Sequence, residues 1–169
     1  MMSGSVLLLL AVTAERLGEL ILARRNTAAL KARGAVEVAA GHYPLIVLLH
    51  TLWLAGLWLL AHDAPLSLGW LSVFGLLQIL RFWTLFTLGR RWTTRIIVLP
   101  GETLVAKGPY RFLRHPNYVV VIGELAVLPL CFGMPLYALL FSALNAAILT
   151  IRIKAENAAL AGSLRAKSP

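Results

Sequence analysis

The sequence from Lys107 to Tyr118 reads K-G-P-Y-R-F-L-R-H-P-N-Y and stands between two long apolar stretches. Pro109 and Pro116 disfavour helical geometry in the residues before them, so the segment interrupts the helices on either side. Its basic side chains supply hydrogen-bond donors, and its two tyrosines supply aromatic faces with a hydroxyl at the tip. This mixture exceeds what a plain connection between helices needs, and it predicts a pocket for a small ligand with both anionic and cationic groups.

The composition of the chain predicts an integral membrane protein. Hydrophobic residues make up 59% of the 169 residues, and charged residues make up 14%. A single domain of this length cannot bury so much apolar surface in its own core, so much of that surface must face lipid. The chain has one cysteine, Cys131, which excludes an intrachain disulfide and a cysteine-based metal site.

The basic residues indicate how the chain crosses the membrane. They gather in the segments 24–33, 90–114 and 152–167, and two more, Arg16 and Arg81, lie inside apolar runs. This alternation follows the positive-inside rule and accounts for the net charge of +9 without a nucleic-acid partner. With five spans it places the N-terminus outside and the C-terminus in the cytosol, and we expect the membrane to be a bacterial inner membrane.

The apolar runs predict an all-α fold with about five transmembrane helices, at 5–23, 43–61, 68–88, 118–132 and 136–151. The last two are joined by G-M-P and predict a helical hairpin. Residues 1–169 then form a single membrane domain, with three N-terminal transmembrane helices in 1–88 and the catalytic, ligand-binding half in 89–160. Within the cytosolic segment, the stretches 93–99 and 103–105 flank a Pro-Gly turn and predict a short β-hairpin.

Charged residues inside apolar runs are costly and need partners. Glu15 and Glu19 share one face of the first run, and Arg16 lies three residues from Glu19. These three predict a self-neutralising cluster that faces the interior of the bundle, with contact to the substrate as the alternative. Arg81 predicts a structural ion pair, with a ligand contact as the alternative.

Two further polar residues lie within apolar runs. We expect His50 to be neutral and hydrogen-bonded to a neighbouring helix. Glu124 predicts a hydrogen bond across the helical hairpin. No two histidines have ligand spacing with a carboxylate, so we expect no metal site.

Arg152 and Glu156 are i and i+4 neighbours and project from one face of the last helix. An ion pair on the helix surface is one interpretation. In the other, this face meets the 89–116 segment at the cytosolic side and binds a cofactor that has a carboxylate, an amine, a ribose and a soft cation. Glu156 can accept hydrogen bonds from ribose hydroxyls or the amine, backbone N–H groups near Gly108 can hold the carboxylate, and a tyrosine face can contact a sulfonium. Arg152 can hold the anionic head of a lipophilic acceptor that arrives from the bilayer.

The segment G-P-Y-R-F-L-R-H-P-N-Y follows E-T-L-V and precedes R-I-K-A-E by about 34 residues. This set resembles the isoprenylcysteine carboxyl methyltransferase family, and the resemblance covers roughly residues 90–160. The R-H-P-x-Y core together with the later R-x-x-x-E pair is more specific than R-H-P alone. The resemblance implies an integral membrane enzyme that uses S-adenosyl-L-methionine to methylate an oxygen atom.

The resemblance also implies the site residues. Arg152 and Glu156 are expected to be catalytic, Arg152 by binding and orienting the acceptor and Glu156 by fixing the cofactor. The expected cofactor contacts are Glu102, Thr103, Leu104, Val105, Tyr110, His115, Pro116, Asn117, Tyr118 and Glu156.

The N-terminal half, with E-R-L-G-E-L-I-L-A-R-R-N and G-H-Y-P, resembles a short bacterial branch of the family. Members of that branch are associated with type III polyketide synthases and O-methylate long-chain alkylpyrones. The tail lacks the G-x-x-Y-x-x-Y-x-x-x-V-P ending common in the family. The expected acceptor is therefore an isoprenylcysteine-type carboxylate or a long-chain alkylpyrone hydroxyl. Three alternatives stay open: a phospholipid N-methyltransferase, a membrane reductase that uses NADPH, and a membrane assembly protein without catalytic activity.

Overall fold

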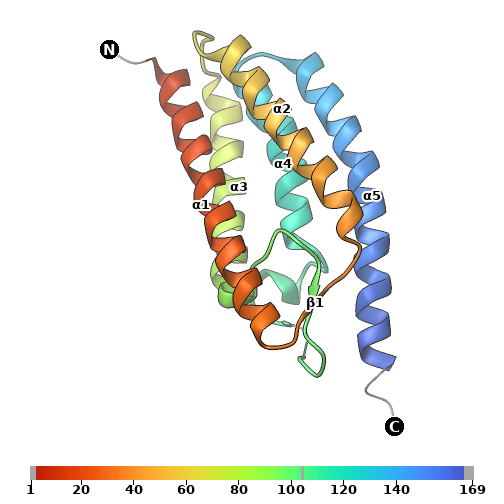
Figure 1. The fold of residues 1–169 in the computed structure, drawn as a ribbon. Helices are drawn as coiled ribbons and strands as arrows, with labels where there is room; N and C mark the ends of the chain where they lie inside the picture. The colour runs from red at the N-terminus through yellow and green to blue at the C-terminus, as the bar shows by residue number, and fades with distance from the viewer. Residues whose placement is uncertain (1–2, 104, 166–169) are drawn as a thin grey trace.

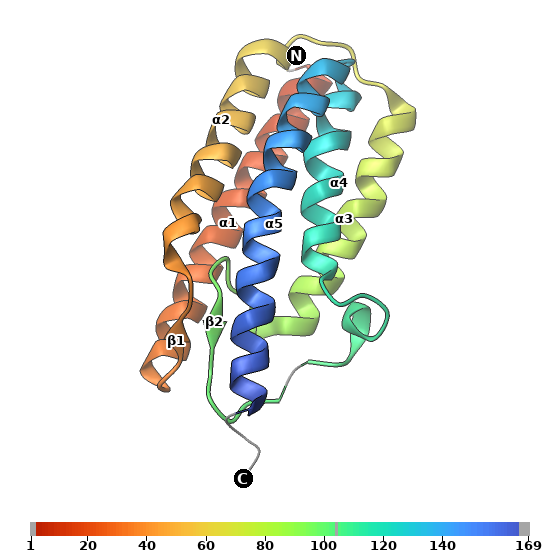
Figure 2. The same ribbon diagram turned by 90° about the vertical axis from the view of Figure 1, so that its right-hand side faces the viewer.

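Five α-helices pack side by side in a computed structural model that describes residues 3–103 and 105–165, with side chains described through residue 159. They are α1 (Gly4–Ala32), α2 (Tyr43–Ala61), α3 (Leu68–Leu88), α4 (Pro116–Cys131) and α5 (Pro135–Arg165). Short 3-10 helices lie at Ala40–His42, Gly89–Arg91 and Gly108–Arg111. Figures 1 and 2 show that α1 begins at one end of the bundle and that α5 ends at the other.

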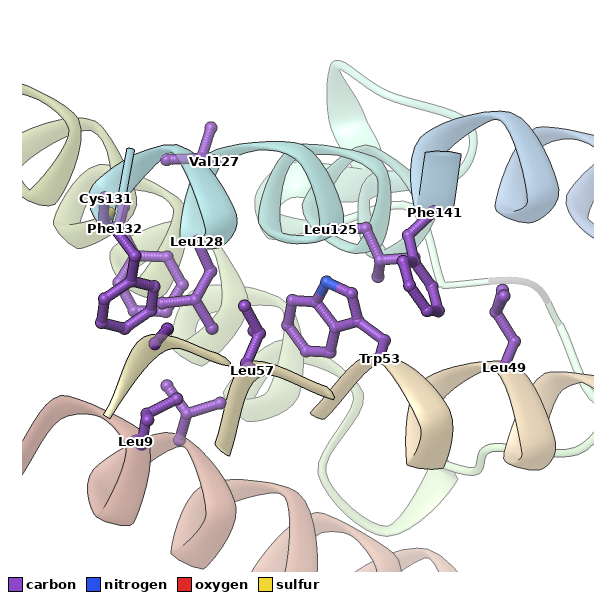
Figure 3. Close-up of a cluster of buried hydrophobic side chains, with 13 residues drawn as sticks. Leu9, Leu49, Trp53, Leu57, Leu125, Val127, Leu128, Cys131, Phe132 and Phe141 are labelled. Atoms are coloured by element: carbon purple, nitrogen blue, oxygen red, sulfur yellow. The ribbon is translucent and has the colours of Figure 1, made fainter. Parts of the chain in front are cut away.

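The apolar core lies where α1, α2 and α4 meet (Figure 3). Trp53 and Leu57 of α2 point toward Leu125 and Leu128 of α4, and Leu9 of α1 packs nearby. All five side chains are almost completely buried. The outward faces are apolar as well, with Leu59, Leu68, Phe86 and Leu136 at least 76% exposed. Apolar side chains on both the inside and the outside are expected of helices that lie in lipid.

Within the part of the chain that the structure describes, three stretches of helix are long and apolar enough to cross a membrane: Ala40–Ala61, Leu68–Arg91 and Pro135–Ala159. They contain α2, α3 and α5 and support the expected membrane protein. α4 is apolar but has 16 residues, which span about 24 Å and fall short of a hydrocarbon core of about 30 Å. The count of five spanning helices therefore stays a prediction.

The predicted helical hairpin is present. α4 ends at Cys131 and α5 begins at Pro135, so three residues connect them. Gly133 has φ +69°, a left-handed conformation that glycine adopts without side-chain strain, and its N–H donates to the carbonyl of Leu130 at 3.1 Å. The hairpin places the C-terminal half of α5 at the same end of the bundle as the start of α4.

The predicted β-hairpin within 93–105 is wrong. The described residues contain two strands, β1 (Val36–Glu37) and β2 (Ile97–Val98), which pair antiparallel. β2 thus pairs with the α1–α2 connection. The carbonyl of Thr103 instead accepts a hydrogen bond from Arg91 Nη1 at 2.7 Å, so the chain after the Pro-Gly turn is held elsewhere.

The reason for this error is the length of α1. The helix continues through the basic segment to Ala32, and the chain then reverses at Gly34, which has φ +87°. Val36 is thereby brought opposite Val98. This partnership links residues that are 62 positions apart, which a reading of local turn signals does not reveal.

Glu37 gives the strand pair a pH dependence. Its carboxylate accepts hydrogen bonds from Lys31 Nζ at 2.7 Å and from Arg95, and these bonds hold the pKa of Glu37 below its ordinary value of 4.5. Because the folded-state pKa is depressed, this stabilisation is present above the ordinary value and is lost as pH falls through the folded-state pKa. We expect Glu37→Gln to lower the midpoint of thermal unfolding at pH 7 but not at a pH that protonates Glu37. Unfolding of the detergent-solubilised protein at both pH values measures this, and equal shifts would contradict it.

Candidate functional site

The hydroxyl of Tyr118 joins the two site residues predicted on α5. It donates a hydrogen bond to Glu156 Oε2 and accepts one from Arg152 Nε at 3.0 Å. Tyr118 lies in the first turn of α4, which begins at Pro116, where proline is tolerated because that N–H has no helical partner. The i,i+4 spacing on α5 brings Arg152 and Glu156 to the same hydroxyl, so the surface ion-pair interpretation is replaced by a bridge through Tyr118.

Arg152 is fixed from a second side. Its Nη2 donates to the backbone carbonyl of Thr94 at 2.9 Å, and its side chain lies against the Tyr118 ring, with 5.7 Å between the guanidinium carbon and the ring centroid. Arg152 is only 8% exposed. A buried guanidinium held by two neutral oxygen atoms keeps its positive charge free for an anionic group, which is what a residue that orients an anionic acceptor needs.

His115 and Tyr110 surround Glu156. His115 Nδ1 lies 3.8 Å from Glu156 Oε1, and the imidazole stacks on the Tyr118 ring with 5.1 Å between centroids. Burial raises the pKa of Tyr110, and the negative charge of Glu156 raises it further, so this phenol stays protonated. The side chain of Glu156 keeps 27% of its surface exposed, which leaves its carboxylate accessible to a ligand.

Tyr118 also lines a cavity of about 440 Å³. Asn117, Tyr118 and Arg152 line one end of it. Much of its wall is apolar and comes from α1, α2, α4 and α5, with Leu17, Leu20, Ile46, Leu54, Val121 and Ile148 among the lining residues. Of the residues that the structure describes, His115 and Glu156 do not line the cavity. Tyr118 and Arg152 therefore belong both to the polar cluster and to the wall of a largely apolar cavity.

Five charged residues of α1, α3 and α4 form one group, which we call the Arg81 cluster: Glu15, Arg16, Glu19, Arg81 and Glu124, with Glu15 Oε1 3.5 Å from Arg81 Nε. Arg81 is 2% exposed, and its Nη1 contacts both oxygens of Glu19 at 2.6 and 2.8 Å. Its Nε contacts Glu124 Oε1 at 2.6 Å, and its Nη2 also pairs with Glu124. Arg16 pairs with Glu124 and, at 3.2 Å, with Glu19. Pairing of this kind offsets the cost of burying charge, and the predicted interior-facing cluster and the structural pairing of Arg81 are both present.

Two expectations on the polar residues within the helices are wrong. Glu124 does not bond across the α4–α5 hairpin among the described residues; its partners are on α1 and α3, including Gln78 Nε2 at 2.8 Å. His50 Nδ1 bonds to the carbonyl of Ile46 at 2.8 Å, on its own helix rather than a neighbouring one. The large arginine side chains reach Glu124 from α1 and α3, and a histidine can always reach the carbonyl one turn before it.

The expected cofactor segment at 102–105 makes contacts with the end of α1 and with the 3-10 helix Gly89–Arg91. Glu102 pairs with Arg33 and Arg91, each at 2.9 Å, and the Thr103 carbonyl is bonded to Arg91 as described above. Val105 is partly buried, and Leu104 lies outside the described residues. The structure thus brings His115, Tyr118, Arg152 and Glu156 together, while the cofactor roles of 102–105 stay a prediction.

Sequence reasoning missed Thr94 and Tyr43. The carbonyl of Thr94 fixes Arg152, and its Oγ1 lies 3.0 Å from the hydroxyl of Tyr43, which begins α2 and lines the cavity. Arg95 stacks over the Tyr43 ring, with its guanidinium carbon 4.3 Å from the centroid. A backbone carbonyl leaves no residue-type signal in a sequence, so the contact at Thr94 was not predictable from the pattern.

Comparison with known proteins identifies the family of the chain. The model of the isoprenylcysteine carboxyl methyltransferase (ICMT) family matches residues 70–162. The chain is 42% identical over 159 residues to the uncharacterized protein YpbQ of Bacillus subtilis, over 91% of this chain and 95% of that one. It is 28% identical over 163 residues to an uncharacterized protein of Haemophilus influenzae, over 88% of this chain and 90% of that one. No solved structure matches the chain at a significant level. The chain therefore belongs to the isoprenylcysteine carboxyl methyltransferase family, which indicates a membrane methyltransferase.

Proposed function

We propose that this protein is an integral membrane O-methyltransferase that uses S-adenosyl-L-methionine and acts on a lipophilic acceptor at the cytosolic face. The acceptor class is an isoprenylcysteine-type carboxylate or a long-chain alkylpyrone hydroxyl. The chain crosses a bacterial inner membrane with five helices, its N-terminus outside and its C-terminus in the cytosol. The start of α1 and the end of α5 lie at opposite ends of the bundle, as an odd number of crossings requires. The basic segments, which the positive-inside rule assigns to the cytosol, support the orientation.

One observation carries the proposal: the Tyr118 hydroxyl is bonded to Glu156 on one side and to Arg152 on the other. Next to Glu156, the accessible polar groups are Glu156 itself and His115. Next to Arg152 lies the apolar cavity, which Arg152 lines. A methyltransferase needs two ligands, a polar one and here a lipophilic one, to meet at a single point. The two environments that meet at Tyr118 match these two ligands.

The residues around Glu156 fit the cofactor. The Glu156 carboxylate can accept hydrogen bonds from ribose hydroxyls or from an amine, and the stacked His115 and Tyr118 rings offer aromatic faces to a cation. Gly108 has φ +58°, and a Cβ there would overlap Thr87 Oγ1, so only glycine fits this turn. Pro109 has no N–H, and the Tyr110 N–H donates to the Lys107 carbonyl at 3.2 Å. This leaves the N–H of Gly108 as the donor that the turn can offer to a carboxylate.

Methyl transfer depends more on the positioning of the two reactants than on acid–base catalysis. When bound, S-adenosyl-L-methionine supplies a methyl group on a sulfonium, which an oxygen nucleophile takes by in-line displacement. Arg152 orients the acceptor oxygen, and the apolar cavity excludes water from the lipid chain. A carboxylate is already ionised at neutral pH because free carboxyl groups titrate near about 4. A pyrone hydroxyl is an acidic enol that can lose its proton to solvent before the transfer, so neither acceptor requires a general base from the chain.

Purified protein incubated with labelled S-adenosyl-L-methionine and host membrane lipids tests the proposal. We expect label in a lipid product, and mass spectrometry should find that product heavier than its precursor by one methyl group. Thermal stabilisation by S-adenosyl-L-methionine but not by NADPH is the matching binding result. Stabilisation by NADPH alone, or label confined to phospholipid amines, would contradict the proposal.

Tyr118→Phe removes the shared hydroxyl and keeps the ring. We expect kcat/KM for methyl transfer to fall about tenfold, because Arg152 and Glu156 each lose a hydrogen bond that sets their position. Tyr137→Phe is the matched control, since its hydroxyl bonds to the carbonyl of Trp53 at 2.8 Å, outside the site. Equal rates for Tyr118→Phe and the wild type would refute the role of the bridge.

A further inference from the structure

The cavity has a second polar region, remote from Tyr118 and Arg152. Arg16, Glu19, His50 and Arg81 line it. Tyr43 and Arg152 both contact Thr94, so they lie at about the same position along the axis of the bundle. His50 follows Tyr43 by seven residues on α2, or about 10 Å at the helical rise of about 1.5 Å per residue. The apolar residues Ile46 and Val47 lie on α2 between the two levels and also line the cavity.

His50 offers a hydrogen-bond acceptor in this region. Its Nδ1 lies 2.8 Å from the carbonyl oxygen of Ile46, and a carbonyl can only accept, so Nδ1 carries the proton. In the neutral ring, Nε2 then presents a lone pair. Nε2 has no hydrogen-bond partner in the part of the chain that the structure describes. An acceptor left without a partner against hydrocarbon is unfavourable.

Arg16 offers donors at the same level. Its terminal nitrogens pair with Glu19 and Glu124, yet 18% of its side-chain surface stays exposed, and it lines the cavity together with His50. A plain hydrocarbon chain satisfies neither residue. A ketone or an ester can accept from Arg16 but cannot donate to His50. A hydroxyl group does both.

We propose that this region is a subsite for a hydroxyl group on the chain of the acceptor, about 10 Å from the group that Arg152 holds. His50 Nε2 accepts from the hydroxyl, Arg16 donates to it, and His50 determines specificity. This inference rests on the proposed function in one respect, that the cavity holds the acceptor with its polar head at Arg152. Of the two proposed acceptor classes it favours the long-chain alkylpyrone, with a hydroxyl partway along its alkyl chain, because an isoprenyl chain carries no hydroxyl.

The experiment compares the affinities of three long-chain acids for the full-length protein in detergent, measured by calorimetry. Octadecanoic acid has no hydroxyl, 10-hydroxyoctadecanoic acid carries one at about the required distance, and 3-hydroxyoctadecanoic acid carries one near its head. We expect the 10-hydroxy acid to bind about tenfold more tightly than the other two, as one added hydrogen bond to a buried partner predicts.

The variants assign this preference to His50. His50→Leu should abolish the preference for the 10-hydroxy acid without weakening octadecanoic acid, and His50→Gln, which keeps an acceptor, should retain part of it. Ser72→Ala is the matched control and should keep the full preference, because the Ser72 hydroxyl bonds to its own helix at Leu68 and Ser72 is not among the described residues that line the cavity.

Equal affinities of the three acids for the wild type, a preference that survives in His50→Leu, or failure of all three acids to bind would each overturn the subsite. The readout is binding and needs no methyl transfer. A protein that prefers the 10-hydroxy acid through His50 but transfers no methyl group would therefore overturn the proposed function and leave the subsite standing.

Discussion

Arg152→Ala is expected to lower kcat/KM for methyl transfer by about a hundredfold, the cost of removing a charged group that orients a reacting oxygen. Arg152 has the position for this role, because it is 8% exposed, held by Tyr118 and Thr94, and at one end of the cavity. We expect the affinity for S-adenosyl-L-methionine to change little, since Glu156 and His115 remain. Initial rates with the lipid acceptor and calorimetric titration with the cofactor measure the two quantities.

Two variants make the Arg152 result specific. Lys154→Ala removes an exposed positive charge from the same turn of α5 and should leave the rate unchanged. Arg152→Lys keeps the charge but cannot contact two oxygens in the fixed planar geometry of arginine, so an intermediate rate is expected. Loss of cofactor affinity in Arg152→Ala equal to its loss of rate would show that Arg152 acts on the cofactor instead of the acceptor.

Arg81→Met is expected to lower the free energy of unfolding by about 3–5 kcal/mol, because it leaves the carboxylates of Glu19 and Glu124 without their central partner. Glu124 is completely buried, so water cannot compensate for the missing guanidinium. Denaturation of the solubilised protein, followed by tryptophan fluorescence, measures the change.

The matched control for Arg81 is Arg33→Met, which removes an arginine from an ion pair on the surface. Arg33 is 58% exposed, and its pair with Glu102 is expected to contribute less than about 1 kcal/mol. Combining Glu124→Gln with Arg81→Met should recover part of the lost stability, because one of the uncompensated charges is removed. A double variant that is less stable than Arg81→Met would argue against charge burial as the cause.

The sequence predicts the helices better than their partners. Hydrophobic runs locate α2, α3 and the α4–α5 hairpin because burial and lipid contact act on each helix separately. The same reasoning ends the first apolar run near residue 23, whereas α1 continues to Ala32. The added turns contain arginine, alanine, leucine and lysine, which favour helix without being embedded in lipid. The partner of β2 was then assigned to the wrong segment, since that partner depends on where α1 ends.

For the site, the sequence indicates residue types and one spacing. The i,i+4 pair Arg152 and Glu156 is local, so their shared face follows from helix geometry. The shared hydroxyl of Tyr118 depends on how α4 packs against α5, which no spacing encodes. The partners of Glu124 were missed for the same reason: Arg16 and Arg81 come from helices far away in the chain, and long side chains can reach a carboxylate from several directions.

The pairing of β1 with β2 has a consequence for how much of the chain a working enzyme requires. The family match begins at residue 70, after β1 and the first two long helices. A fragment cut at that point would retain Tyr118, Arg152 and Glu156 but would lose the strand that braces β2 and, with it, the neighbourhood of the Thr94 carbonyl. The part of the chain before residue 70, about two fifths of its length, is therefore a structural part of the proposed site and not an exchangeable membrane anchor. Swapping it between relatives would require the Val36–Val98 register to be preserved.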